Sequence, residues 1–352
     1  MRRVTMPSWP SWMPIEPFIA ALVATVGLAA LLPAKGAAAP VADGASSFAV
    51  ALLFFLYGAR LSSREALAGL SHWRLHLTVV LSTFVLFPLL GLAARGLVPY
   101  VLTPQLYTGL VYLCVLPSTI QSSIAFTSIA RGNVSAAICA GTYSALLGMV
   151  VTPVLAGLLL HSSGAGFSAQ GPADIALQLL APFLAGQLLR RWIGGFVIRH
   201  KKVLGLVDRG SILCVVYTAF SAGMVHGIWH QVTAARLLAL LGVEAVLLGL
   251  VLCLTSVAAR RLGFPRGDRV AIVFCGSKKS LANGLPMASV LFGAQSGLMI
   301  LPLMLFHQMQ LMVCAVIAKR WSHDSTDADG GREGSLPSER SSPDAQARPV
   351  HA

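Results

Sequence analysis

Long apolar segments recur along most of the chain and are separated by short polar connections. Each segment approaches the roughly 20 residues that an α-helix needs to cross a membrane. The pattern therefore predicts an all-α integral membrane protein with ten transmembrane helices. The ten expected spans lie at about residues 15–32, 45–60, 75–98, 106–130, 134–160, 173–190, 207–228, 235–258, 270–292 and 298–318.

The composition agrees with this pattern. Of the 352 residues, 56% are hydrophobic and only 11% are charged, whereas soluble domains carry roughly 25% charged residues. The six cysteines all lie within apolar segments and form no CxxC pair, so we interpret them as small apolar side chains rather than as disulfides or metal ligands. We expect no bound cofactor.

Basic residues occupy alternate connections between the spans. If the N-terminus is cytoplasmic, nearly all Lys and Arg of the loops lie on the cytoplasmic side, and only Lys35, Arg95 and Arg236 lie on the other. This asymmetry predicts a multi-pass protein of the cell inner (cytoplasmic) membrane with both termini in the cytoplasm. The net charge of +13 then orients the chain and contacts anionic membrane lipid, and it does not indicate nucleic acid.

The ten spans divide into two groups of five. Because five is odd, the second group enters the membrane inverted relative to the first, and inverted repeats are typical of secondary transporters. The expected organisation is a lead at 1–14, a first repeat at 15–161, a linker at 162–172, a second repeat at 173–320, and a disordered cytoplasmic tail at 321–352.

The fourth and ninth spans are unusually polar and hold corresponding positions in the two halves. They contain CVLPSTIQSSIAFTS (114–128) and CGSKKSLANGLP (275–286). Pro117 and Pro286 each remove a helical hydrogen bond, so we expect both helices to break in their middle. Broken backbone at membrane depth is tolerated only where it lines a cavity or is packed in protein.

Lys278 and Lys279 lie inside the ninth span, where a charge costs ~2.5–3.5 kcal/mol on the gentlest scale. Neighbours on a helix point about 100° apart, so one lysine can pair with Glu244 on the preceding span while the other faces a cavity. The alternative is that the ninth span begins later and both lysines extend to the cytoplasmic edge.

Freed amides at a helix break, together with a lysine, favour an anion. Our candidates for the substrate site are Ser118, Gln121, Ser122, Ser123, Ser277, Lys278, Lys279, Ser280 and Asn283. Our candidates for ion coupling are Ser123, Ser277, Glu244 and His307. The alternative interpretation of the serines is helix–helix packing by small residues, and that of His307 is a packed, hydrogen-bonded side chain.

No HExxH, GxSxG or Walker motif occurs, so we expect no enzyme. The predicted function is secondary active transport of a small organic anion by alternating access. The alternative is a non-transporting membrane sensor or structural protein. The sequence does not identify the substrate or the direction of transport, and it leaves assembly as a homodimer open.

SSIAFTSIARGNVSAAI (122–138) and FCGSKKSLANGLPMASVLF (274–292) together resemble the bile acid:sodium symporter family, and most closely its SBF-like branch of sodium/bile acid cotransporters. The resemblance covers about residues 15–320. It implies a panel domain of the first, second, sixth and seventh spans and a core domain of the other six. It also implies that the fourth and ninth helices unwind and cross, and that bile acids or other carboxylates move with sodium.

The sodium ligands of that family transfer only in part. Aligned on the RGNVSAA turn and on Gly284-Leu285, the ligand positions are Ser123, Ile124, Ala137, Gly141, Ser277 and Leu281. Only Ser123 and Ser277 keep an oxygen ligand. The family therefore implies Na+ as coupling ion, whereas these residues predict a weak dependence on sodium. A lysine beside the lost acidic ligand would be a fixed cation where a sodium ion is bound in relatives.

Overall fold

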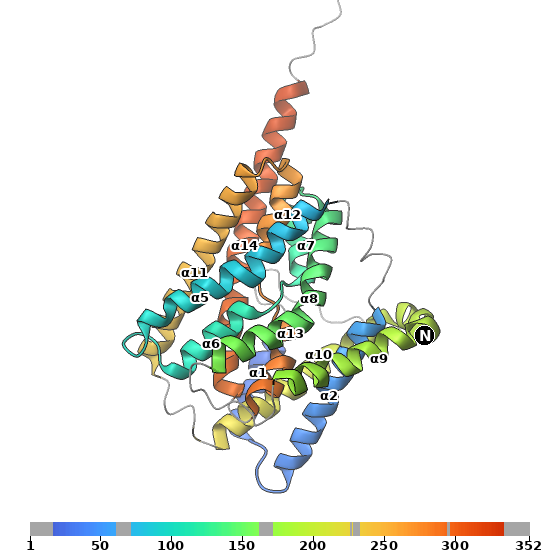
Figure 1. Ribbon diagram of the computed structural model, residues 1–352, viewed down its shortest axis with the longest axis vertical. Helices are drawn as coiled ribbons and strands as arrows, with labels where there is room; N and C mark the ends of the chain where they lie inside the picture. Colours follow the sequence, from blue (N-terminus) through green and yellow to red (C-terminus); the bar gives the residue numbers. More distant parts are fainter. Residues whose placement is uncertain are drawn as a thin grey trace, which may run out of the picture.

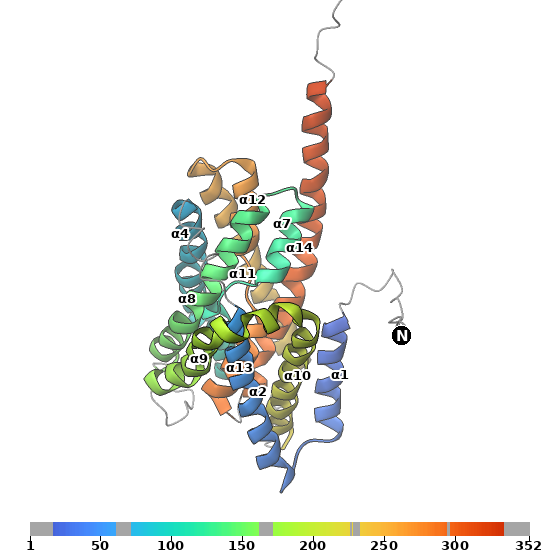
Figure 2. The same ribbon diagram turned by 90° about the vertical axis from the view of Figure 1, so that its right-hand side faces the viewer.

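The computed structural model describes residues 17–60, 72–161, 172–225, 227, 233–293 and 296–333, and the regular elements in these ranges are helices (Figures 1 and 2). The first half of the chain forms α1 (Pro17–Leu31), α2 (Ala38–Arg60), α4 (Trp73–Leu81), the π-helical η2 (Ser82–Leu86), α5 (Phe87–Ala93), the short 3-10 helix η3 (Ala94–Leu97), α6 (Pro104–Val115), α7 (Ile120–Ile129) and α8 (Val134–His161). The second half forms α9 (Pro172–Arg199), α10 (Lys201–Val225), α11 (Ala234–Arg261), α12 (Arg266–Gly276), α13 (Leu281–Phe292) and α14 (Ser296–Glu333).

The apolar segments of the sequence coincide with these helices. Among the described residues, six helical segments are long and apolar enough to cross a membrane. They are α2, the run from α4 to η3, α8, α10, α11 and most of α14. Helices α6 and α7, which are bent by 65° at a short break, would together form a seventh. The prediction of an all-helical membrane protein is confirmed at this level.

Helices α1, α2, α9 and α10 pack on one another, with α2 lying along both α9 and α10 and α1 along α10 (Figure 2). They correspond to the first, second, sixth and seventh expected spans. Gly58 of α2 faces the carbonyl of Phe183 on α9, and Gly186 of α9 faces the carbonyl of Phe55 on α2. A Cβ at either glycine would collide with the opposite backbone, so this close crossing requires small residues.

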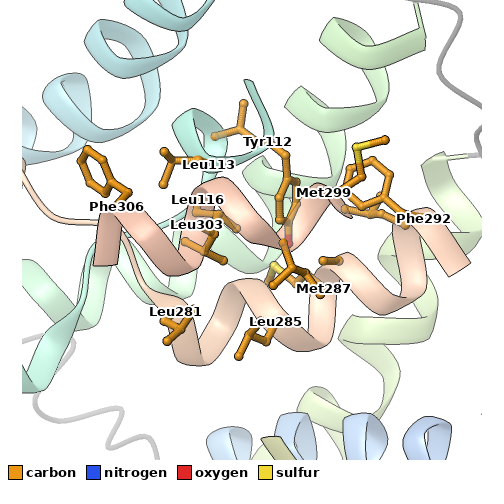
Figure 3. Close-up of a cluster of buried hydrophobic side chains, with 14 of the residues drawn as sticks. Tyr112, Leu113, Leu116, Leu281, Leu285, Met287, Phe292, Met299, Leu303 and Phe306 are labelled. Atoms are coloured by element: carbon orange, nitrogen blue, oxygen red, sulfur yellow. The ribbon is translucent and has the colours of Figure 1, made fainter. Parts of the chain in front are cut away.

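Helices α6, α13 and α14 form a second packed group. Figure 3 shows their shared cluster of buried apolar side chains. Its labelled members are Tyr112 and Leu113 of α6, Leu116 directly after α6, Leu281, Leu285, Met287 and Phe292 of α13, and Met299, Leu303 and Phe306 of α14. The Tyr112 ring packs edge-on against Phe292 at a centroid distance of 5.1 Å. Its hydroxyl donates to the carbonyl of Gly284 at 2.6 Å, so the one polar atom of this side chain is satisfied within the cluster.

The break in the ninth span is not where we predicted it. Helix α13 runs through Pro286 without interruption, and the break lies upstream, at residues 277–280. A proline removes only one backbone donor, and a membrane helix packed in protein tolerates that loss. The expectation that Pro117 interrupts the fourth span is confirmed, because α6 ends at Val115 and α7 begins at Ile120.

The ends of the expected domains fall partly outside the described residues. This applies to the lead at 1–14, to nearly all of the linker at 162–172, and to the tail from residue 334 onward. Helix α14 continues to Glu333, beyond Arg320, where we expected the second repeat to end. The change to a polar composition at this point therefore does not coincide with the end of the helix.

Candidate functional site

The two helix breaks meet. The backbone N–H of Ser280, in the break between α12 and α13, donates to the carbonyl of Pro117, in the break between α6 and α7, at 2.9 Å. Leu116 is extended (ψ 154°), as expected for a residue that precedes proline. Ser280 begins α13 as its N-cap, and its hydroxyl accepts from the N–H of Asn283 at 3.2 Å. We call the contact of these two breaks the junction.

Hydroxyl groups of the fourth span satisfy carbonyls at the end of α12. The last carbonyls of a helix lack intrahelical partners. Ser118 Oγ donates to the carbonyl of Cys275 at 2.5 Å, and Ser123 Oγ donates to that of Phe274 at 3.0 Å. Thr119 Oγ1 donates to the carbonyl of Lys279 at 2.7 Å. The dense polar run after Pro117 therefore connects the two broken helices.

Lys279 is the centre of the junction. Its side chain is 0% exposed, and its Nζ donates to the carbonyls of Thr83 at 2.8 Å, Cys114 at 2.7 Å and Leu116 at 2.7 Å. The ammonium has three N–H donors, so this set matches its capacity. Its Nζ also lies 4.1 Å from the centroid of the Phe87 ring, which adds a cation–π contact. The site is built for a cation.

Two prolines leave these carbonyls free. The N–H of Phe87 donates to the carbonyl of Ser82 in the π-helical turn, and the next residue, Pro88, has no N–H to offer to Thr83. At the end of α6, Pro117 likewise offers no donor to Cys114. The N–H of Ser118, which would continue the helix, donates to Ser144 Oγ instead at 2.9 Å. The backbone irregularities of two spans thus converge on one side chain.

Gln310 of α14 holds the backbone of Lys279 from the other side. Its Oε1 accepts from the Lys279 N–H, and its Nε2 donates to the Lys279 carbonyl, each at 2.9 Å. The same Nε2 lies 2.9 Å from His307 Nδ1. This places His307 next to the junction but in contact with Gln310 rather than with the lysine ammonium.

Lys278 points away from Lys279. Its side chain is also 0% exposed, but within the described residues its Nζ has no hydrogen-bond partner. The Nζ lies 3.8 Å from the centroid of Phe126 on α7 and 5.9 Å from that of Phe274 on α12. The sequence argument that adjacent lysines would take different surroundings holds.

The expected pairing of a lysine with Glu244 is wrong in this structure. Glu244 is 0% exposed on α11, and neither of its carboxylate oxygens has a hydrogen-bond partner among the described residues. The alternative, that the lysines extend to the membrane edge, is also wrong, because both are buried at the break. The reason is that Lys279 finds its partners on the backbone of α6 and η2.

A cavity of about 420 Å³ opens beside the junction, between it and the group α1, α2, α9 and α10; we call it the junction cavity. Thr119 and Gln121 line it from the first break, and Ser280 and Asn283 line it from the second. Its walls are largely apolar. They include Ile120, Leu146, Met149, Phe183 and Ile212.

The junction cavity has one basic end. Arg60 at the end of α2 lines the cavity and forms an ion pair with Asp208 of α10, which lines it as well. Arg209 also lines the cavity, with its guanidinium carbon 5.8 Å from the centroid of the Phe18 ring. Because Asp208 neutralises one of the two arginines, the net charge at this end remains positive. An apolar chamber with a cationic end suits an amphipathic anion.

A second cavity, of about 380 Å³, lies at the other end of α13, and we call it the distal cavity. Ser289 and Gly293 of α13 line it, together with Asp43 and Ser46 of α2 and Thr218 of α10. Helix α13 thus runs from one cavity to the other. Both lie between the junction-bearing helices and α2 with α10.

The structure separates the predicted site residues into three groups. Gln121, Ser280 and Asn283 line the junction cavity. Ser118, Ser123, Lys279 and the backbone around Ser277 build the junction itself. Ser122, Lys278, Glu244 and His307 do not line either cavity.

Several contributors were not predicted. Arg60 and Arg209 were interpreted only as loop charges, whereas Arg60 ends α2 and Arg209 lies inside α10. Thr119 belongs to the polar run after Pro117, and Gln310 to the polar LFHQMQL segment (305–311). The carbonyl of Thr83 is a backbone group, so no side chain in the sequence indicates that it binds Lys279. Only Pro88 within the third span indicates irregular backbone at this point.

Comparison with known proteins gives a consistent result. Residues 16–323 match the model of the SBF-like CPA transporter family. The chain is 55% identical to a Pseudomonas aeruginosa protein named "Uncharacterized protein PA2026", over 91% of this chain and 97% of that one. It is 50% identical to the Escherichia coli protein named "Putative symporter YfeH", over 91% and 97%. It is 31% identical to mouse sodium/bile acid cotransporter 7, over 87% and 93%.

Proposed function

Because the chain belongs to the SBF-like CPA transporter family, we propose that it is a secondary transporter of an organic anion whose substrate binds in the junction cavity. The observation that carries this proposal is the lining of that cavity. Gln121, Ser280 and Asn283 come from both helix breaks, and Arg60 and Arg209 come from the packed group opposite. A relative movement of the two groups would therefore change the cavity directly.

The lining also supports a substrate class. The walls are mostly apolar, while the polar groups gather at the junction and at the arginine end. A molecule with an apolar body and one carboxylate or similar anionic group would satisfy both regions. The names of the relatives, which include a symporter and sodium/bile acid cotransporters, agree with such a substrate.

We propose that transport of the anion is not coupled to the binding of two sodium ions. In this proposal the ammonium of Lys279 takes the place of a bound sodium ion, since three carbonyls and an aromatic face already surround it. Of the residues aligned with sodium ligands, only Ser123 and Ser277 carry a side-chain oxygen, and the Ser123 hydroxyl donates to the carbonyl of Phe274. Transport then needs no sodium gradient. Glu244 and Lys278 are buried and have no hydrogen-bond partner among the described residues, so we propose them as candidates for proton exchange.

Alternating access would use the two cavities in turn. The junction and distal cavities lie at opposite ends of α13, so each is suited to open toward a different side of the membrane. This scheme includes the finer features that we inferred from the sequence: ten spans in two inverted repeats, the inner membrane, and cytoplasmic termini. Under that orientation the junction cavity, with Arg60 and Arg209 at its end, faces the cytoplasm.

Binding and transport can be tested separately. Purified protein is first heated with bile acids, keto acids and other carboxylates, and a ligand that raises its unfolding temperature is then used in proteoliposome counterflow. We expect one amphipathic carboxylate class to stabilise the protein and to exchange across the membrane. A ligand that stabilises the protein but never exchanges would support the sensor alternative. Absence of stabilisation by every anion would contradict the proposed site.

A further inference from the structure

A third pocket lies away from the junction, where the end of α11, the start of α12 and the outer part of α14 come together. Figure 1 shows these three segments side by side at the top of the molecule. The pocket has a volume of about 150 Å³. Its polar lining consists of Ser256, Arg260, Arg266, Arg269 and Trp321. We call it the arginine pocket.

Among the described residues, no ion pair neutralises the arginines of this pocket. No acidic residue is part of its described lining. Asp268, on the same turn of α12, is buried and bonded instead to Asn133 Nδ2 at 2.7 Å. One N–H of the Arg266 guanidinium donates to the Trp321 carbonyl at 2.6 Å. Within the described ranges, neither Arg260 nor Arg269 forms an ion pair.

The shape and size of the pocket suit a small oxyanion. Arginine forks bind phosphate oxygens with paired hydrogen bonds, and the first turn of α12 adds the positive end of a helix. A volume of about 150 Å³ has room for roughly five waters at ~30 Å³ each, which is enough for one tetrahedral group. A group with a long body would have to extend outside the pocket.

Exposed apolar side chains also lie along α11. Leu250, Leu254 and Val257 are exposed and recur at the spacing of one helical face, which adjoins the face that carries Ser256 and Arg260. Trp321 has the amphipathic ring that is enriched where a membrane meets water. A phosphate in the pocket could therefore carry acyl chains that lie on this face. Basic pockets between membrane helices are known sites for acidic headgroups.

We propose that the arginine pocket binds a phosphate group, supplied either by an anionic phospholipid headgroup or by a free phosphate compound. The pocket is also connected to the lysine-bearing break. The ring of Trp321 lies 5.5 Å from that of Phe274, which lies 5.9 Å from Phe126, the ring beneath Lys278. The side chain of Phe274 therefore lies between Trp321 in the pocket lining and the ring that Lys278 contacts.

The test compares variants of the full-length protein in detergent. Arg260→Gln and Arg269→Gln each remove a charge from the lining, while Arg261→Gln removes a neighbouring exposed charge that does not line the pocket. Each protein is titrated with phosphatidylglycerol, with phosphatidylcholine and with inorganic phosphate, and bound lipid is counted by native mass spectrometry alongside the unfolding temperature. All three arginines replaced are solvent-facing or partly so, and the unliganded variants should unfold like the wild type.

We expect phosphatidylglycerol to bind about tenfold more weakly to the two pocket variants, and with unchanged affinity to Arg261→Gln. Stabilisation by phosphatidylglycerol alone identifies the lipid headgroup as the source. Stabilisation by inorganic phosphate that the same two variants lose identifies a free phosphate compound. An equal loss in all three variants would indicate diffuse attraction to the basic surface and overturn the proposal. Unchanged binding in all of them would overturn it as well.

Discussion

Lys279 donates from its Nζ to the carbonyl of Leu116 at 2.7 Å, across the contact of two broken helices that lie far apart in the sequence. Leu116 is the C-cap of α6 and precedes Pro117, which has no N–H to donate, so the last carbonyls of the helix lack intrahelical donors. The lysine therefore satisfies a defect that the proline creates. A positive charge at this depth is stable because the backbone that surrounds it has no other donor.

The two lysines should differ in their effect on stability. Lys279→Met removes three hydrogen bonds and leaves three buried carbonyls unpaired, at ~1–3 kcal/mol each. Lys278→Met removes no hydrogen bond and keeps an apolar contact with Phe126. We expect thermal unfolding in detergent to show a large fall in melting temperature for Lys279→Met, and little change or a rise for Lys278→Met. A larger fall for Lys278→Met would contradict the assignment.

The serines after Pro117 should act as structural ties. Ser118→Ala leaves the carbonyl of Cys275 without its donor, which we expect to cost ~1–3 kcal/mol of stability. Ser122→Ala is the matched control, because the Ser122 hydroxyl has no partner in the described structure. Chemical or thermal unfolding of the two variants measures the difference. Equal stability, combined with a selective loss of substrate affinity in Ser118→Ala, would show that Ser118 contacts substrate instead.

The arginine end of the junction cavity should select the charge of the substrate. Arg209→Gln removes the cation of this end that forms no ion pair with a described residue, so the affinity for an anionic ligand should fall about tenfold. Arg236→Gln, at the far end of α11 and outside the cavity, is the control. Isothermal titration with the ligand found by thermal shift measures both. The same weakening in both variants would point to long-range electrostatics and not to a binding contact.

Asn283 offers a second test of the same cavity from the opposite wall. Asn283→Leu keeps the branched shape of the side chain and removes its amide, while the N–H of residue 283 can still donate to Ser280 Oγ. We expect the variant to fold and to lose most of its ligand affinity and counterflow. Normal counterflow by Asn283→Leu would remove the second break from the substrate site.

The sequence predicts the all-helical membrane character of this protein because the signals for it are local, while the ten spans and their inverted repeats stay predictions. The length of the apolar segments predicts the spans. Pro117 predicts the first break because proline has no backbone N–H to donate. The second break was misplaced, because Pro286 carries the same signal and yet lies within α13. There the break is set by tertiary contacts, namely the Gln310 amide on both backbone groups of Lys279 and the Thr119 hydroxyl.

The site was harder to predict for the same reason. The sequence showed that Lys278 and Lys279 needed partners, and it offered Glu244 as the one acidic side chain at comparable depth. The actual partners of Lys279 are backbone carbonyls. Every residue has one, so the sequence does not indicate which of them bind the lysine. Arg60 and Arg209 were visible, but the packing of α2 against α10 that brings them to one cavity was not.

In the proposed mechanism, the ammonium of Lys279 takes the place of a coupling sodium ion. Uptake of the identified anion into proteoliposomes is measured for the wild-type protein with an inward sodium gradient and, at equal ionic strength, with potassium or N-methylglucamine in its place. We predict the same initial rate in all three conditions, because the cation site is already occupied by an ammonium. Uptake that requires sodium would contradict this role of Lys279. An initial rate that rises with the square of the sodium concentration would contradict it more strongly.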